Sequence, residues 1–131
     1  MRAQRFESST EFPVASAVLW NFHLRPEALE VLAPPFAGFE VLDGGAGVAE
    51  GSVLTMTVGR GPFRSRWVAL HCGVVPGREF HDVALESPFP YWVHRHHVVP
   101  LGPAASRLTD TVWFVPPRWL PRALGAALTR I

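Results

Sequence analysis

The sequence predicts an α+β fold with one curved antiparallel sheet of seven strands, two short helices after the first strand, and a shortened C-terminal helix over a cavity. Three observations support this prediction. Residues 4–12 alternate polar and apolar side chains, as a half-buried strand does. Residues 13–35 carry apolar side chains at helical spacing, interrupted by prolines. After Gly38, turn signals recur every ~8 to 12 residues, which is typical of antiparallel sheets.

The two helices follow the first strand, "QRFESSTEF", directly. Pro13 opens the first helix, because proline is tolerated in a first helical turn. Apolar side chains then recur at helical spacing, at Val14, Val18 and Phe22. Pro26 interrupts this helix, and a second short one continues through Ala28, Leu29 and Leu32. The two prolines at 34–35 end the pair.

Six further strands complete the expected sheet. They cover residues 38–45, 52–62, 63–75, 79–86, 91–100 and 106–115. The glycine-rich stretches 44–51 and 59–62 separate strands and complete no nucleotide-binding fingerprint, so they are expected to be hairpin turns. In the tail, Leu120, Leu124 and Leu128 form one stripe of an amphipathic helix, with Pro121 in its first turn. Since a single sheet needs a cover, this helix is expected to lie over it.

Composition restricts the class of protein. The chain of 131 residues predicts one domain, 1–131, and its 48% apolar and 18% charged residues are typical of an ordered globular protein. A net charge of +1, with arginines scattered along the chain, argues against a nucleic-acid partner. No apolar run is long enough for a membrane span. The single cysteine, Cys72, is expected to be a small core residue and favours a cytoplasmic protein.

The stretch "YWVHRHHVVP", residues 91–100, contains three histidines and predicts a functional face. Strand alternation places Trp92, His94 and His96 on one side, with Arg95 and His97 on the other. His94 and His96 are about 6.6 Å apart along a strand, a workable spacing for one metal ion, and His71 or Asp110 could complete a ligand set. No third ligand is fixed by local spacing, so we expect no metal and no other cofactor.

The favoured alternative is a polar layer in which these imidazoles hydrogen-bond to Asp82 or Asp110. A histidine beside a carboxylate can also hold a proton near neutral pH, which is what acid–base catalysis requires. Asp110 shares its face with Leu108, Val112 and Phe114, and this should raise its pKa unless an imidazolium compensates. No residue is assigned a catalytic role at this level.

Several segments resemble the START/Bet v 1-like (SRPBCC) superfamily, specifically its small bacterial cyclase/dehydrase-type members, which have a helix-grip fold. These segments are "LWNFHLRPEALEVLAPPFAGFEVL", "GPFRSRWVALH", "FHDVALESPFPYWVHRHHV" and "LTDTVWFVPP". Three features depart from the pattern. Ser87 replaces a usual glycine, Phe114 a common tyrosine, and the segment after Pro117 spans only about 20 Å as a helix. The cavity is therefore expected to be open at one end or covered by a second copy in a homodimer.

The resemblance implies a cavity between sheet and C-terminal helix that binds a hydrophobic or amphipathic small molecule, such as a lipid-, aromatic- or polyketide-like one. The predicted inner face has the mixed composition of such a pocket. Its candidate ligand-binding residues are Trp67, His71, Phe80, Asp82, Trp92, His94, His96, Asp110 and Phe114. Two alternatives remain. One is a polyketide cyclase or aromatase that uses a His/Asp pair in the same cavity, and the other is a structural or regulatory partner that dimerises.

Overall fold

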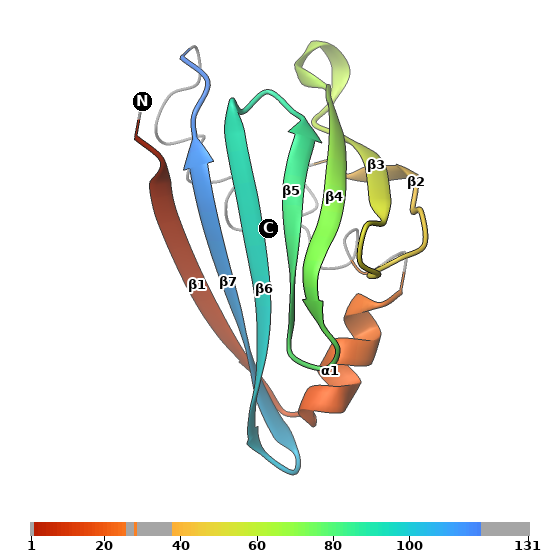
Figure 1. Ribbon diagram of the computed structural model, residues 1–131, viewed down its shortest axis with the longest axis vertical. Coiled ribbons are helices and arrows are strands. Elements are labelled where there is room, and N and C mark those ends of the chain that lie inside the picture. The colour runs from red at the N-terminus through yellow and green to blue at the C-terminus, as the bar shows by residue number, and fades with distance from the viewer. Residues whose placement is uncertain (1, 26–27, 29–37, 119–131) are drawn as a thin grey trace.

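The computed structural model describes residues 2–25, 28 and 38–118, and within them the predicted seven-stranded antiparallel sheet is confirmed. The strand order is β1-β7-β6-β5-β4-β3-β2, so consecutive strands pair along the sheet while β1 pairs with β7 at one edge (Figure 1). The strands are β1 Gln4–Phe12, β2 Glu40–Asp43, β3 Val53–Val58, β4 Ser65–Val75, β5 Glu79–Glu86, β6 Tyr91–Gly102 and β7 Ala105–Val115. A short 3-10 turn, η2 (Gly61–Phe63), joins β3 to β4.

The helix α1 (Ser16–His23) differs from the prediction in its start and in its buried face. Pro13 lies three residues before the helix, so it is not in the first turn. Val18 is 56% exposed, whereas Leu19, Trp20 and His23 are buried. The reason is that the segment before the helix is tied to β7, where the Ser106 hydroxyl donates to the Val14 carbonyl at 2.8 Å. Helical periodicity therefore begins later and selects a different stripe.

The second predicted helix and the C-terminal helix fall on residues 26–37 and 119–131. Apart from Ala28, which is buried, these residues lie outside the part of the chain that the structure describes. Among the described helices, none is long and apolar enough to cross a membrane.

The core lies on one face of the sheet and has two parts. One part is aromatic and sits over β3, β4, β6 and β7, with Met56, Val58, Trp67, Phe89, Trp92, Val112 and Phe114 as its members. The other part joins α1 to the opposite end of the sheet, through Leu19, Trp20, Phe80, Val98 and Leu108. The helix lies at that end in Figure 1 and contacts β6 and β7. Between these two parts the inner face carries polar side chains.

Two local features set which side chains face inward. Ser87 stands in the turn between β5 and β6, where its hydroxyl accepts from the Phe89 amide at 3.0 Å and donates to the Phe89 carbonyl at 3.1 Å. This turn brings Phe89 into the core. In β4, a bulge at Gly73, whose φ is +59°, shifts the register after Cys72. Consequently Val74 packs against the α1 part of the core, while His71 keeps the inward orientation predicted for it.

Candidate functional site

A cavity of about 120 Å³ opens on the inner face of the sheet. Seven of the nine predicted site residues line it, namely Trp67, His71, Phe80, Asp82, Trp92, His94 and His96. The other two stand on β7, beside β6, and contact residues that line the cavity. Asp110 hydrogen-bonds to His94, and Phe114 packs on Trp92 with ring centroids 6.3 Å apart. The strand alternation therefore brought the predicted residues to one face, and packing decided which of them reach the cavity.

One half of the cavity is apolar. Its wall is formed by side chains of β3, β4, β5 and β6, including Leu54, Met56, Val58, Ala69 and Ala84. Trp67 and Trp92 meet edge to face at 5.1 Å, and Phe89 packs against both indoles. Aromatic side chains in such pairs are held in fixed orientations, so this wall is a preformed surface for an apolar ligand.

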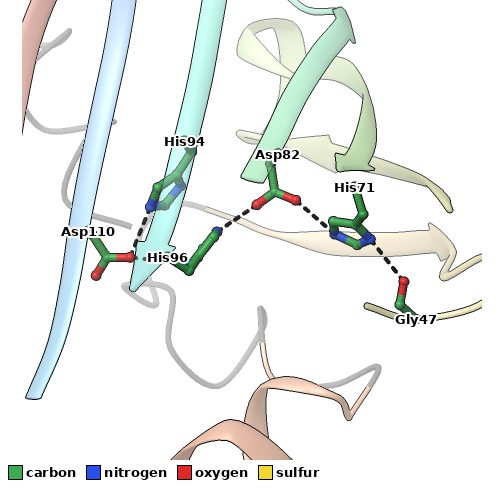
Figure 2. Close-up of polar contacts among 6 residues, drawn as sticks. All are labelled: Gly47, His71, Asp82, His94, His96 and Asp110. Carbon is green, nitrogen blue, oxygen red and sulfur yellow. Dashed lines mark hydrogen bonds and ion pairs between the residues drawn. The ribbon is translucent and has the colours of Figure 1, made fainter. Parts of the chain in front are cut away.

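The other half carries a continuous chain of polar contacts across β4, β5, β6 and β7 (Figure 2). His71 Nδ1 donates to the Gly47 carbonyl at 2.9 Å, and its Nε2 lies 2.7 Å from Asp82 Oδ1. His96 Nε2 donates to Asp82 Oδ2 at 2.6 Å, while its Nδ1 lies 3.3 Å from Asp110 Oδ1. His94 Nε2 donates to the same Asp110 oxygen at 2.9 Å. Imidazole rings and carboxylates thus alternate along the chain.

Two bonds in this chain are not those that the strand register alone would choose. Asp82 stands opposite His94 across β5 and β6, yet its carboxylate bonds to His96. Asp110 stands opposite His96 across β6 and β7, and its closest bond goes to His94. Each carboxylate reaches diagonally, which is within range on one face of a sheet. The diagonal bonds join β5, β6 and β7, and the contact of Asp82 with His71, which stands directly opposite it, adds β4 to the layer. The layer agrees in outline with the one predicted from the sequence.

Both nitrogens of His96 face carboxylates, so this ring is an imidazolium. Burial alone would lower the pKa of His96, but the Asp82 and Asp110 carboxylates outweigh it and raise the pKa to about 9. His71 is in a similar position, because Gly47 and Asp82 both present acceptors to it. Burial opposes the charge, and Asp82 overcomes it, so the pKa of His71 is also raised.

His94 is neutral. Burial lowers its pKa first, and the neighbouring His96 charge lowers it further, against the opposing effect of Asp110. Since Nε2 donates to Asp110, the proton of the neutral ring is on Nε2 and Nδ1 is an acceptor. No hydrogen bond to Nδ1 occurs among the described residues. His94 therefore presents a neutral base to the cavity, held in place by Asp110.

The two carboxylates are ionised. Burial acts to raise their pKa values, but it is outweighed: His96 and His71 lower the pKa of Asp82, and His94 and His96 lower that of Asp110. The apolar neighbours of Asp110 predict a raised pKa unless an imidazolium compensates, and His96 supplies that charge. His71 and His96 each have both ring nitrogens against acceptor oxygens, and when both rings are protonated they balance the two carboxylates, so the burial of the layer is tolerable.

Asp82, His94 and His96 could also hold a metal ion, because one ligand atom from each lies within 4.8 Å of the others. The arrangement is unfavourable for this at neutral pH. A metal needs the lone pair of an imidazole nitrogen, and both nitrogens of His96 carry protons directed at carboxylates. Binding would have to displace a proton from a group whose pKa is about 9.

His23 on α1 is a cavity residue that sequence reasoning missed. It is 7% exposed and lines the cavity, and its Nδ1 donates to the Leu19 carbonyl at 2.8 Å. Its Nε2 is buried without a hydrogen-bond partner. Such an unpaired atom costs about 1–3 kcal/mol. The sequence did contain a signal, because His23 follows Leu19 by four residues and therefore shares its helix face. That face is buried, whereas the predicted face with Val18 is exposed.

Other residues that the sequence singled out lie outside the cavity. Arg95 faces away from it and pairs with Glu79. Cys72 is a half-buried free thiol. In β4 it stands between His71, which is buried, and Gly73, which is exposed. It was expected in the core, but the alternation that turns His71 inward turns Cys72 outward.

Solved structures resemble this chain over nearly its whole length. A START superfamily protein from Mycobacterium smegmatis matches with a TM-score of 0.72 and 15% identity, covering 96% of this chain and 90% of that one. The Zhui aromatase/cyclase from Streptomyces sp. R1128 matches with a TM-score of 0.69 and 18% identity, covering 86% and 68%. Norcoclaurine synthase from Thalictrum flavum, with a transition-state analogue bound, matches with a TM-score of 0.66 and 18% identity, covering 96% and 89%.

At these identities the likeness establishes the fold. No family model and no curated protein matches the sequence. The three similar structures include a named enzyme that makes norcoclaurine and one named as an aromatase/cyclase, so the same architecture surrounds more than one chemistry.

Proposed function

We propose that this chain, whose fold is that of the START/Bet v 1-like superfamily, binds a hydrophobic or amphipathic small molecule of lipid-, aromatic- or polyketide-like character in its inner cavity. The observation that carries this proposal is the division of one cavity into an aromatic wall and a neutral, internally paired polar layer. A ligand with an apolar body and a polar end matches that division.

In this proposal the residues divide by role. Trp67, Trp92 and Phe80 contact the body of the ligand, whereas His71, His94, His96 and Asp82 orient its polar end. Asp110 and Phe114 act indirectly, by holding His94 and Trp92 in position. The polar layer needs no counter-ion from the ligand, because its charges cancel within the layer. A neutral polar group is therefore the expected end.

Native mass spectrometry of the protein purified from its own host tests the proposal. We expect a co-purifying small molecule. Ala69→Leu narrows the cavity, because Ala69 is a buried part of its wall, and should reduce the bound fraction at least tenfold. Val68→Leu, one residue away on β4 and outside the cavity lining, is the matched control and should retain the ligand. A ligand that remains bound to the Ala69 variant would place binding elsewhere.

A second candidate function is catalysis of the polyketide cyclase or aromatase type. The observation that favours it is the His94–Asp110 pair, in which a neutral imidazole with an unpaired Nδ1 is oriented by a carboxylate. If this pair moves protons, His94→Ala should abolish turnover of the ligand identified by mass spectrometry and leave its affinity nearly unchanged. Loss of affinity without any turnover in the original protein would favour simple binding.

We further propose a cytoplasmic setting, since Cys72 is a free thiol and the only cysteine of the chain. A homodimer in which a second copy covers the cavity is also proposed. Light scattering of the purified protein, with and without the ligand, measures its mass directly. A monomer in both states would contradict the dimer.

A further inference from the structure

His23 lines the cavity and carries a buried hydrogen-bond acceptor without a partner. A carbonyl oxygen can only accept, so the 2.8 Å contact between Nδ1 and the Leu19 carbonyl requires the proton to be on Nδ1. The ring is also fixed by contacts with Phe22 and Phe80, at centroid distances of 6.1 and 6.3 Å. Nε2 of the neutral ring is consequently a lone-pair acceptor of fixed direction.

The ring stays neutral because of its surroundings. Burial lowers the pKa of His23 despite the helix carbonyl, and the imidazolium of His96, with its ring centroid 6.1 Å away, lowers it further. The carboxylates of Asp82 and Asp110 act in the opposite direction but more weakly. A second proton on Nε2 would be buried and unpaired.

His23 Nε2 is a fully buried side-chain atom without a hydrogen bond, unlike His94 Nδ1, which is also unpaired but is not among the fully buried atoms of the described residues. Only one other such atom, Asp82 Oδ1, lacks a hydrogen bond, and that oxygen has the His71 ring at 2.7 Å. Nε2 has no hydrogen-bonding partner among the residues that the structure describes. Buried acceptors are normally paired, so the partner of Nε2 is expected to come from the contents of the cavity.

We propose that His23 Nε2 accepts a hydrogen bond from a hydroxyl group of the bound molecule, and so selects hydroxylated aromatic ligands over their non-hydroxylated analogues. This inference rests on the proposed binding function and names the ligand class. A carboxylate offers no proton to a neutral acceptor. A cationic donor would be repelled by the nearby His96 imidazolium. A neutral donor is left, and a phenolic, enolic or alcoholic hydroxyl, which offers one proton and carries no positive charge, is such a donor.

The experiment compares two probes of nearly equal shape, p-cresol and p-xylene, which differ by one hydroxyl in place of one methyl. Both probes have a single ring, which keeps them close in size to a cavity of about 120 Å³; for scale, an engineered apolar cavity of about 150 Å³ holds benzene. Affinities are measured by NMR titration of the full chain. Three proteins are used: the original, His23→Phe, which keeps an aromatic ring without an acceptor, and His23→Gln, which restores an acceptor oxygen.

We expect the original protein to bind p-cresol at least tenfold more tightly than p-xylene. His23→Phe should remove this preference by weakening p-cresol alone, and His23→Gln should recover part of it. In the original protein, the ¹⁵N resonance of His23 Nε2 should shift on adding p-cresol and not on adding p-xylene. This second measurement needs no variant, so it stands even if a substitution prevents folding.

Two kinds of result would overturn the inference, and only one of them would also overturn the proposed binding function. If p-xylene binds as tightly as p-cresol, or if the preference survives in His23→Phe, the hydroxyl selection is wrong while an apolar binding cavity remains. If neither probe binds the original protein, the proposed binding function is overturned together with it.

Discussion

The imidazole rings of His94 and His96 stack with centroids 3.9 Å apart, and they hold different charges. Two buried cations at this distance would repel each other strongly, so the proton affinities of the pair must separate. His96 takes the charge because it touches two carboxylates, whereas His94 touches one. Phe80 stacks on the other face of His96, with centroids 4.3 Å apart. The pair is thus an acid and a base side by side at the cavity wall.

This separation predicts a pH dependence of stability. The pKa of His96 is about 9 in the folded protein and about 6.5 in the unfolded chain, so its contribution is complete below pH 6.5 and is lost as the pH rises towards 9. The loss is on the order of 3 kcal/mol. The lowered pKa of His94 acts oppositely, since its contribution is present above pH 6.5 and falls as the pH drops. Stability should therefore be greatest near pH 6.5.

Urea unfolding followed from pH 5 to 9.5 measures this profile. His96→Gln should remove most of the decline on the alkaline side, while His97→Gln, on the neighbouring residue of β6 that lies outside the cavity lining, should keep it. A free energy of unfolding that is constant from pH 6.5 to 9 would contradict the charge assigned to His96.

Asp82 is predicted to be the most sensitive member of the polar layer, because it is shared by two imidazolium rings. Asp82→Asn leaves both His71 and His96 without their common carboxylate and should cost about 3–5 kcal/mol of unfolding free energy. Glu79→Gln removes a carboxylate from the partly exposed pair with Arg95, and is expected to cost below about 1 kcal/mol. Denaturant unfolding measures both losses. If the two variants lose the same unfolding free energy, the polar layer contributes no more to stability than the partly exposed ion pair does.

Zinc binding is predicted to be weak at pH 7 and to strengthen with pH. The donor set of Asp82, His94 and His96 becomes usable only when His96 loses a proton, so affinity should rise about tenfold per pH unit between 7 and 9. Calorimetric titration with Zn²⁺ at pH 7, 8 and 9 measures the slope, and His96→Gln should abolish it. Tight binding at pH 7 with no pH dependence would indicate a true metal centre.

The inner face of the sheet was predictable from the sequence because strand periodicity is a local property. The strand 79–86 has the same bounds in prediction and structure, and His94 and His96 face inward with Trp92 as expected. The pairing within the layer was not predictable. Whether Asp82 bonds to His94 or His96 depends on diagonal reach between strands, which no single strand encodes.

His23 was missed for a different reason. Which face of a helix is buried depends on the residue at which the helix begins. The spacing of Val14, Val18 and Phe22 is genuine in the sequence, but Val14 lies before α1 and is held by Ser106 of β7. A contact of such long sequence separation cannot be read from local periodicity. Once the helix starts at Ser16, Leu19 and His23 share the buried face and His23 reaches the cavity.

Gly73 is predicted to be the position where the β4 backbone tolerates change least. Its φ of +59° is unfavourable for other residues, and an added Cβ would lie 2.7 Å from His81 Nδ1. Gly73→Ala should therefore cost more than the about 1–2 kcal/mol of a left-handed residue alone. Gly77→Ala is the control, since Gly77 has a φ of +79° but open space around it, and should cost about that backbone amount.

The excess loss in Gly73→Ala should come from crowding against His81, and a double-mutant cycle with His81→Ala separates this contribution from backbone strain. If crowding dominates, the double variant recovers the excess and matches Gly77→Ala in urea unfolding. If Gly73→Ala and Gly77→Ala lose the same unfolding free energy, the cost at the bulge is backbone strain alone and crowding against His81 contributes nothing. The bulge turns Val74 into the core, where it packs against the cluster that contains Leu19 and Trp20. If Gly73→Ala loses still more unfolding free energy and also shifts the NMR resonances of α1, the bulge also positions the helix that carries His23.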